Sequence, residues 1–229
     1  MLVASGQPVE LDSHMARLAT GLGDLFGEPA PRGTREQLQG RAKEIDLGRL
    51  RLTVAPDSSG KLSTEIVAAE LDPELVFPSW ERAVTLRGVA AEGGLGALKW
   101  ADRAFLERAE AAVPGRAVPL LLDAGDYVLE ASRASVFAVI EGTVCTPPTN
   151  GRILPGIARR AAIEIAGEQE VEVREERLTV GDLIAADEVF VTGSVRGVEP
   201  VKAVDDARIS PAGEIGERIA QALRQRWLG

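Results

Sequence analysis

One lysine of this chain lies where an amine could act as a nucleophile. Lys99 follows a glycine-rich turn, Gly93 to Leu98, and precedes a predicted helix. A lysine that attacks a carbonyl carbon must be partly desolvated or lie near other cations, because its amine is then neutral. By its position alone Lys99 would more often be a solvated surface residue, so the case for chemistry depends on other residues.

A carboxylate and an arginine could complement this lysine. Glu130 closes an apolar predicted strand, where its carboxylate could keep the nitrogen of a bound ring protonated. Arg17 lies on a predicted helix in the run His14 to Leu18, and its forked guanidinium could hold a phosphate. A glutamate at a strand end is by itself more often a solvated residue, so neither side chain is decisive alone.

Two backbone segments could bind a phosphate. The run Leu154 to Ala158 (Leu-Pro-Gly-Ile-Ala) begins a predicted helix, and the N–H groups and dipole of a helix start attract anions. Thr192 to Ser194 (Thr-Gly-Ser) closes an apolar strand and offers a hydroxyl. A helix start alone is usually an ordinary capped end. Together, a lysine for an aldehyde, a carboxylate for a pyridine nitrogen and these phosphate-binding segments indicate a site for pyridoxal 5'-phosphate (PLP).

Composition excludes several other classes of function. The chain has 229 residues and a formal charge of −9, and it lacks a basic block, which argues against nucleic-acid binding. The single cysteine, Cys145, cannot form an intrachain disulfide, and buried packing is its expected role. The single histidine, His14, makes a Ser-His-Asp triad or a histidine metal site improbable. No apolar run has the length of a membrane span and no signal peptide is visible, so a cytoplasmic, membrane-free protein is expected.

Hydrophobic periodicity predicts a chain that mixes helices with many short strands. The predicted helices are Leu11 to Phe26 with Asp12 or Ser13 as cap, Thr34 to Ile45 with Thr34 as cap, Trp100 to Ala112, Gly156 to Ala166, Val180 to Ala185 and Ile209 to Trp227. The predicted strands are Arg49 to Val54, Leu62 to Leu71, Ala83 to Val89, Val118 to Leu122, Tyr127 to Glu130, Ser135 to Ile140, Thr143 to Cys145, Glu170 to Arg174 and Glu188 to Val191.

These elements predict an α/β (α+β) protein of two domains. Leu71 to Trp80 contains two prolines and little periodicity, which is typical of a linker. We therefore expect a small N-terminal α/β domain at residues 1–74 and a larger domain at residues 75–229. Short strands joined by tight turns favour a curved antiparallel or barrel-like sheet in the larger domain over a doubly wound one.

The order of the candidate residues is more specific than any one of them. The chain resembles the fold-type IV PLP enzymes, the aminotransferase class IV family, over nearly its whole length and most specifically from Leu120 to Val201. The motifs that carry the resemblance are Glu130-x-x-x-x-Ser135-Val136-Phe137, Thr146-Pro147-Pro148, Ile153 to Ile157 and Ala186 to Phe190. The resemblance implies the D-amino-acid aminotransferase-like fold, PLP bound between a small and a larger barrel-like domain, and a homodimer.

The resemblance also assigns roles to residues. Lys99 would be the catalytic lysine that forms a Schiff base with PLP, and Glu130 the partner of the pyridine nitrogen. Contacts to the rest of the cofactor would come from Arg17, Ile157, Ala158 and Ser194 at the phosphate and from Leu154 against the ring.

Within the family, the residues after the lysine favour one member. Branched-chain enzymes usually run to an Asn-Tyr pair, whereas this chain has Lys99-Trp100-Ala101-Asp102-Arg103. A lysine followed four positions later by arginine looks more like 4-amino-4-deoxychorismate lyase, which releases 4-aminobenzoate and pyruvate on the way to folate. Arg103 would then bind the dianionic amino substrate. The segment Ala97 to Glu110 also resembles lyase domains fused behind aminodeoxychorismate synthase, which suggests that enzyme as a partner.

Three positions depart from the family pattern. The chain begins at Met1, apparently past the first strands of the small domain, so an N-terminally truncated form is expected. Ala158 stands where a threonine usually follows Gly-Ile, and Ser135 stands where asparagine is usual; each should weaken PLP binding by about 1 kcal/mol per lost hydrogen bond. Two alternatives to the lyase therefore remain open: a class IV aminotransferase for branched-chain or D-amino acids, and a non-catalytic member of the family.

Overall fold

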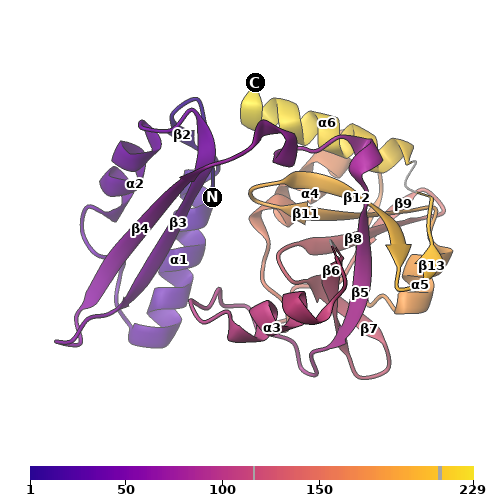
Figure 1. Cartoon of the computed structure of the whole chain (residues 1–229), viewed down its shortest axis with the longest axis horizontal. Coiled ribbons are helices and arrows are strands. Elements are labelled where there is room, and N and C mark those ends of the chain that lie inside the picture. The colour runs from indigo at the N-terminus through magenta and orange to yellow at the C-terminus, as the bar shows by residue number, and fades with distance from the viewer. Residues whose placement is uncertain (116, 211–212) are drawn as a thin grey trace. The chain divides into compact units, whose positions relative to one another are not determined.

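A computed structural model describes residues 1–115, 117–210 and 213–229. The chain forms two compact units, which are described separately. Unit 1 comprises Met1–Val76 and Trp227–Gly229, and unit 2 comprises Phe77–Arg226. Figure 1 labels their elements. No helix in the described ranges combines the length and the apolar character needed to cross a membrane.

Unit 1 is built on an antiparallel sheet with the strand order β2-β1-β3-β4. Its strands are β1 (Leu2–Ala4), β2 (Gln7–Pro8), β3 (Leu47–Pro56) and β4 (Leu62–Glu70). The β3–β4 hairpin confirms the two predicted strands. The Asp57 carboxylate stabilises its loop by accepting the N–H groups of Ser59 and Lys61. Strands β1 and β2 were not predicted, because three and two residues are too few to show an alternating pattern.

Two helices pack on this sheet. The helix α1 (Leu11–Phe26) has the predicted bounds, but its cap was predicted wrongly: Glu10 precedes the helix and accepts a hydrogen bond from the Ser13 hydroxyl at 2.7 Å. The helix α2 (Thr34–Ala42) is three residues shorter than predicted and is preceded by Gly33. Thr34 does not cap it, because its hydroxyl donates instead to the Pro31 carbonyl. The core of unit 1 contains Val3, Leu38, Ala42, Ile45 and Leu50.

Unit 2 contains one large mixed sheet, which in the described residues has nine strands. Their order is β10-β9-β8-β11-β12-β5-β6-β7, with β13 paired to β12. The strands are β5 (Val84–Ala90), β6 (Val118–Asp123), β7 (Tyr127–Ala131), β8 (Ser135–Ile140), β9 (Thr143–Thr146), β10 (Val173–Glu175), β11 (Glu188–Gly193), β12 (Gly197–Val204) and β13 (Ala207–Arg208).

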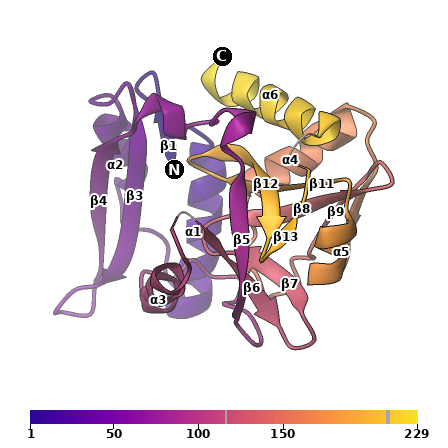
Figure 2. The ribbon, with the colours of Figure 1, turned by 45° about the vertical axis from the view of Figure 1, so that its right-hand side comes forward.

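The sheet of unit 2 curls until its two ends meet. The segment that follows β10 pairs with β7, the strand at the opposite end: the N–H of Val128 donates to Leu178 and the N–H of Val180 donates to Asp126. Figure 2 shows the strands of this sheet from a second direction. Buried aliphatic side chains fill its interior, among them Leu86, Leu120, Val136, Val191 and Val201. The barrel-like sheet is confirmed, although it is mixed, because β5 runs parallel to β6 and β12 and β9 runs parallel to β10.

The helices of unit 2 lie outside this sheet. They are α3 (Ala104–Ala112), α4 (Ile157–Glu168), α5 (Val180–Ala185) and α6 (Glu214–Leu228), whose residues 214–226 belong to unit 2. Short 3₁₀ turns occupy Pro73–Leu75 and Trp80–Arg82, within the predicted linker and just after it. Figures 1 and 2 both show α4 and α6 side by side, and Arg226 of α6 binds the carboxylate of Glu168 with two hydrogen bonds of 2.8 Å.

Two predicted helices of unit 2 begin later than predicted, and strand β12 was not predicted. The helix predicted from Trp100 begins at Ala104, after a turn in which the Asp102 carboxylate accepts the Ala104 N–H. The helix predicted from Ile209 begins at Glu214; Pro211 and Ala212 lie outside the described residues. Strand β12 was missed, because Gly197 and Pro200 within it are residues that strands disfavour.

Candidate active site

Glu130 and Lys99, which are far apart in the sequence, interact electrostatically in unit 2. Glu130 lies on β7, and Lys99 lies in the segment between β5 and α3. Burial raises the pKa of the Glu130 carboxyl to about 7, while the N–H of Leu154 and the charge of Lys99 oppose that rise. The Leu154 nitrogen lies 3.4 Å from Oε1 of Glu130. Lys99 is exposed, which differs from the desolvation expected of a nucleophilic lysine, although its charge reaches a buried carboxyl.

Two residues after Leu154, the start of α4 leaves its backbone donors without a side-chain cap. Gly156 precedes the helix in an extended conformation, and no side chain caps the first turn. A Cβ atom at Gly156 would lie 2.6 Å from the hydroxyl of Ser135, so only glycine allows this close approach. Ile157 and Ala158, the first two residues of the helix, are buried. This helix start therefore has the character of an anion-binding site.

A buried hydroxyl lies on the strand beside this helix start. Thr192 of β11 pairs with Ser135 of β8, the residue that approaches Gly156. The side chain of Thr192 is 2% exposed, and within the described part of the chain its Oγ1 has no hydrogen-bond partner. A buried hydroxyl without a partner is destabilising, and an oxygen of a bound ligand would satisfy it. Ser194 follows in the turn after β11 and is partly exposed.

These residues fit PLP. A carboxyl beside a lysine suits the ring nitrogen and the aldehyde, and an uncapped helix start with a nearby unsatisfied hydroxyl suits the phosphate. The two parts are connected, because Leu154 donates its N–H to Glu130 and stands two residues before Gly156. The structure thus brings Lys99, Glu130 and Leu154 together, and it places Ile157 and Ala158 at the adjoining helix start.

Both arginines singled out from the sequence remain predictions as ligand contacts. Arg17 lies on α1 of unit 1, and burial lowers the pKa of its guanidinium. Arg103 immediately precedes α3, and its charge helps to lower the pKa of the Glu110 carboxyl, although the Arg133 hydrogen bond is the largest cause of that shift. Within unit 2, Arg103 is therefore directed at least partly towards Glu110.

Two residues of the site were missed in the sequence. Asp123 ends β6 and forms an ion pair with Arg152, which lies two residues before Leu154. Neither residue was singled out from the sequence. The adjacent glycines at 93 and 94 could have indicated this contact in the sequence. Two glycines in a row often mark a place where another segment of backbone approaches closely.

Cys145 has the expected structural role. It is 2% exposed within the core of the curled sheet, and burial raises the pKa of its thiol to about 12. A thiol with that pKa is not a nucleophile near neutral pH. No group of three or more histidine, cysteine, aspartate or glutamate side chains suitable for a metal occurs in the described ranges.

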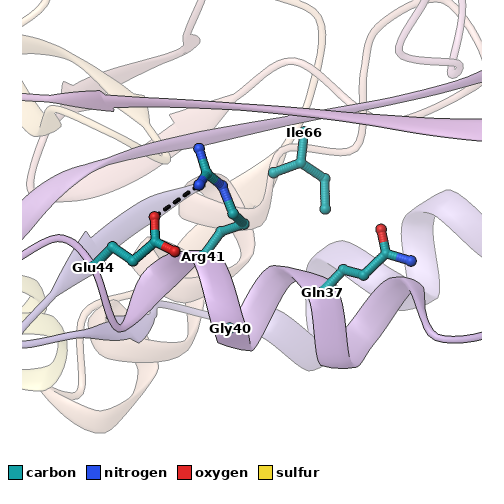
Figure 3. A pocket seen from close by; sticks show the side chains of 5 residues that line it. All are labelled: Gln37, Gly40, Arg41, Glu44 and Ile66. Atoms are coloured by element: carbon teal, nitrogen blue, oxygen red, sulfur yellow. Dashed lines mark hydrogen bonds and ion pairs between the residues drawn. The ribbon is translucent and has the colours of Figure 1, made fainter.

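A groove on unit 1 offers no comparable chemistry. It lies between α2 and β4 and is lined by Gln37, Gly40, Arg41, Glu44 and Ile66 (Figure 3). Its only charged side chains are Arg41 and Glu44, which pair with each other at 2.7 Å. Both are largely exposed, so the groove lacks a desolvated charged group that could bind a ligand strongly.

Comparison with known proteins identifies the family of this chain. The family model described as amino-transferase class IV matches residues 1–204. The branched-chain-amino-acid aminotransferase of Escherichia coli K12 is 35% identical over 162 residues, which cover 68% of this chain and 50% of that protein. A protein of Methanocaldococcus jannaschii described with the same activity is 38% identical over 112 residues, covering 47% of this chain and 39% of its own length. The chain thus spans about half the length, or less, of these curated relatives.

Solved structures agree on the fold. The 4-amino-4-deoxychorismate lyase of Pseudomonas aeruginosa superposes with a TM-score of 0.84 at 25% identity, covering 98% of this chain and 88% of that one. A hypothetical aminotransferase from Mycobacterium tuberculosis, solved in a PLP-bound form, gives 0.83 at 20% identity, covering 96% and 84%; at that identity it supports the fold alone. With the family match over residues 1–204 and the fold in common, this chain belongs to the aminotransferase class IV family.

Proposed function

We propose that this chain binds PLP at Lys99 and acts as a lyase that converts 4-amino-4-deoxychorismate into 4-aminobenzoate and pyruvate. One observation carries the proposal: the charge of Lys99 acts on a buried Glu130 carboxyl, which also faces the Leu154 N–H just before an uncapped helix start. The family to which the chain belongs supports an enzyme, and the lyase is the finer choice within it.

Each residue would make a distinct contact with the cofactor. The amine of Lys99 would attach it covalently, and the carboxylate of Glu130 would keep its ring nitrogen protonated. The N–H groups of Ile157 and Ala158 and the hydroxyl of Ser194 would bind the phosphate, with Arg17 as a further phosphate contact. Leu154 would pack against the ring. The bound cofactor would supply an electron sink for the carbon that carries the substrate amine.

Proton transfer would fall to Lys99. The Nζ of Lys99 would act as the base that takes the proton from the amine-bearing carbon of the substrate. Loss of the enolpyruvyl group as pyruvate leaves an aromatic ring. One lysine serving as base and then as acid suits a chain with a single histidine. Arg103 would attract the two carboxylates of the substrate.

Different observations favour the two leading activities. The run from Lys99 to Arg103 favours the lyase. The 35% identity to the Escherichia coli branched-chain aminotransferase favours amino-group transfer to a 2-oxo acid as the second candidate. A family member that retains the fold without the chemistry is the third.

A paired assay separates these candidates. The purified chain, supplied with PLP, would be given 4-amino-4-deoxychorismate, and separately glutamate or a branched-chain amino acid with a 2-oxo acid. We expect 4-aminobenzoate and pyruvate in equal amounts, and neither from Lys99→Ala. Amino-group transfer without pyruvate would replace the lyase by the aminotransferase. A chain that binds no PLP and does neither reaction would support the non-catalytic alternative.

The proposed assembly is a homodimer that accepts a small amino substrate, with aminodeoxychorismate synthase as a further partner. The support is the family membership and the likeness of Ala97 to Glu110 to lyase domains fused behind that synthase. Light scattering at several concentrations would test the dimer, since a constant monomer mass would contradict it. Co-elution with the synthase in size-exclusion chromatography would test the second association.

A further inference from the structure

The segment that leads to Lys99 turns sharply as it leaves β5. Gly93 and Gly94 both have positive φ, 81° and 77°, a conformation that favours glycine. The N–H of Ala91 donates to Leu122 at 2.7 Å, and the N–H of Gly94 donates to Ala91 at 2.8 Å. These two hydrogen bonds define where the turn begins. They do not fix the residues between the turn and Lys99, which need further contacts.

Asp123 holds this turn from the end of β6. Its Oδ1 accepts the Gly93 N–H at 2.9 Å, and its Oδ2 forms an ion pair with Arg152. The Gly93 hydrogen bond is the largest cause of the lowered pKa of this carboxyl, and Arg152 lowers it further. The side chain of Asp123 is only 9% exposed, whereas that of Arg152 is 36% exposed. One carboxylate thus binds the turn and a second segment at the same time.

Arg152 binds the same turn through its backbone. Its carbonyl oxygen accepts the Gly96 N–H at 3.2 Å. A Cβ atom at Gly94 would overlap that carbonyl group, so the two segments are in backbone contact there. The next residue, Ile153, is buried in a cluster with Ala91, Leu121 and Leu129. Leu154 then donates its N–H to Glu130.

We propose that Asp123 and Arg152 are positioning residues that fix the Lys99 segment against the segment carrying Leu154, and so set where the lysine amine stands relative to the Glu130 carboxyl. The inference rests on the proposed function, because it names a requirement of that site. Neither residue touches the proposed reacting atoms. Asp123 fixes the turn before Lys99, and Arg152 joins that turn to the residue whose neighbour reaches Glu130. If the pair is lost, the fold remains but the lysine is less well placed.

Hydrogen exchange and covalent trapping together test the proposal. Exchange of the amides of residues 92–98 would be measured without cofactor in wild type, Asp123→Asn, Arg152→Met and Arg152→Lys. Trapping would measure how fast PLP is fixed to Lys99 by borohydride. The control is Glu168→Gln, which removes the same charge and also breaks an ion pair, but at the α4–α6 contact.

We expect Asp123→Asn and Arg152→Met to raise exchange in this segment about tenfold, because each removes a charge-assisted hydrogen bond. Trapping at Lys99 should slow by a similar factor. Arg152→Lys should restore part of both effects, and Glu168→Gln should change neither. Wild-type exchange in both variants, or an equal effect of the control, would overturn the proposal.

The two readouts distinguish this inference from the proposed function. If wild type takes up no PLP, the proposed function fails, while the exchange measurement still decides whether the pair holds the segment. If wild type is trapped at Lys99 and the variants are trapped equally fast, the positioning role fails and the proposed function stands. Arg152→Lys keeps the charge and most of the side-chain length. If Arg152→Met does not fold, the comparison of wild type with Asp123→Asn and Arg152→Lys still tests the positioning role.

Discussion

The backbone nitrogen of Leu154 lies 3.4 Å from Oε1 of Glu130. A hydrogen bond of that length stabilises the carboxylate only weakly. Burial therefore dominates and raises the pKa of Glu130 to about 7. Such a carboxyl is close to half-protonated at neutral pH and would gain much from a cationic neighbour, which a protonated pyridine nitrogen would be.

Replacement of Glu130 should change how stability depends on pH. Because its pKa is about 7 in the fold and 4.5 ordinarily, the folded chain binds more protons than the unfolded chain between those values. The contribution of Glu130 is thus fully present below pH 4.5 and is lost as pH rises through 7, by up to about 3 kcal/mol. From pH 4.5 to 8, the unfolding free energy of the PLP-free protein in denaturant should fall more in wild type than in Glu130→Gln, because both proteins retain Glu199, whose pKa burial also raises. Parallel curves for the two proteins would contradict the burial of this carboxyl.

Replacement by valine should affect the free energy of unfolding differently at two buried threonines of the curled sheet. Thr192 has a buried hydroxyl without a partner in the described residues, whereas the Thr146 hydroxyl donates to Val136 at 2.8 Å. Thr192→Val should leave the free energy of unfolding unchanged or raise it by about 1 kcal/mol, and Thr146→Val should lower it by about 1–3 kcal/mol. If the Thr192 hydroxyl serves the phosphate, its loss should also weaken PLP binding about fivefold. A large destabilisation by Thr192→Val would show that the hydroxyl has a protein partner.

One glycine just before α4 and one inside it provide a matched pair for replacement by alanine. At Gly156 a Cβ atom would meet the Ser135 hydroxyl at 2.6 Å, and at Gly167 it would meet nothing within 4 Å. Gly156→Ala should therefore cost about 1–3 kcal/mol of unfolding free energy, and Gly167→Ala should gain up to about 1 kcal/mol. Thermal unfolding measures both. Adding Ser135→Ala to Gly156→Ala should recover part of the loss, and a purely additive double variant would refute the proposed clash.

A glutamate fixes the start of the last helix. The carboxylate of Glu188 accepts the N–H of Ile215 at 3.1 Å and that of Gly216 at 2.7 Å. Its replacement by alanine leaves two N–H groups at the start of α6 without this acceptor and should lower the free energy of unfolding by about 2–4 kcal/mol. Glu188→Gln retains one acceptor oxygen and should lose about half as much. Equal stability of the alanine variant and wild type in urea would contradict this account.

The sequence determined local elements better than the contacts between them. The bounds of α1, β8 and α5 were predicted correctly, because a full helical or strand period lies within each. In α5 the Thr179 and Asp182 capping box also fixes the start. In β12 a glycine and a proline, Gly197 and Pro200, conceal the strand. Helix α3 begins later than predicted, after a turn in which the Asp102 carboxylate accepts the Ala104 N–H, and periodicity does not reveal such a turn.

For the candidate site, too, the sequence predicted individual residues better than the contacts between them. Lys99 and Glu130 were predicted from residue type and order, and the charge of Lys99 opposes the rise that burial causes in the pKa of Glu130; their roles towards a cofactor stay predictions. The ion pair of Asp123 with Arg152 was not predicted, because 29 residues separate its members and only the curl of the sheet brings them together. The orphaned hydroxyl of Thr192 was likewise invisible, since a residue's hydrogen-bond partners depend on the folded neighbours.

Covalent trapping of PLP is the most direct test of the central claim. The chain has four lysines, at positions 43, 61, 99 and 202, so peptide mapping after borohydride reduction resolves each of them. We predict that the adduct forms on Lys99 and that both the adduct and the absorbance band of bound PLP disappear in Lys99→Ala, with Lys202→Ala as the control that retains them. An adduct spread equally over the four lysines, or a band that persists in Lys99→Ala, would contradict a cofactor site at Lys99.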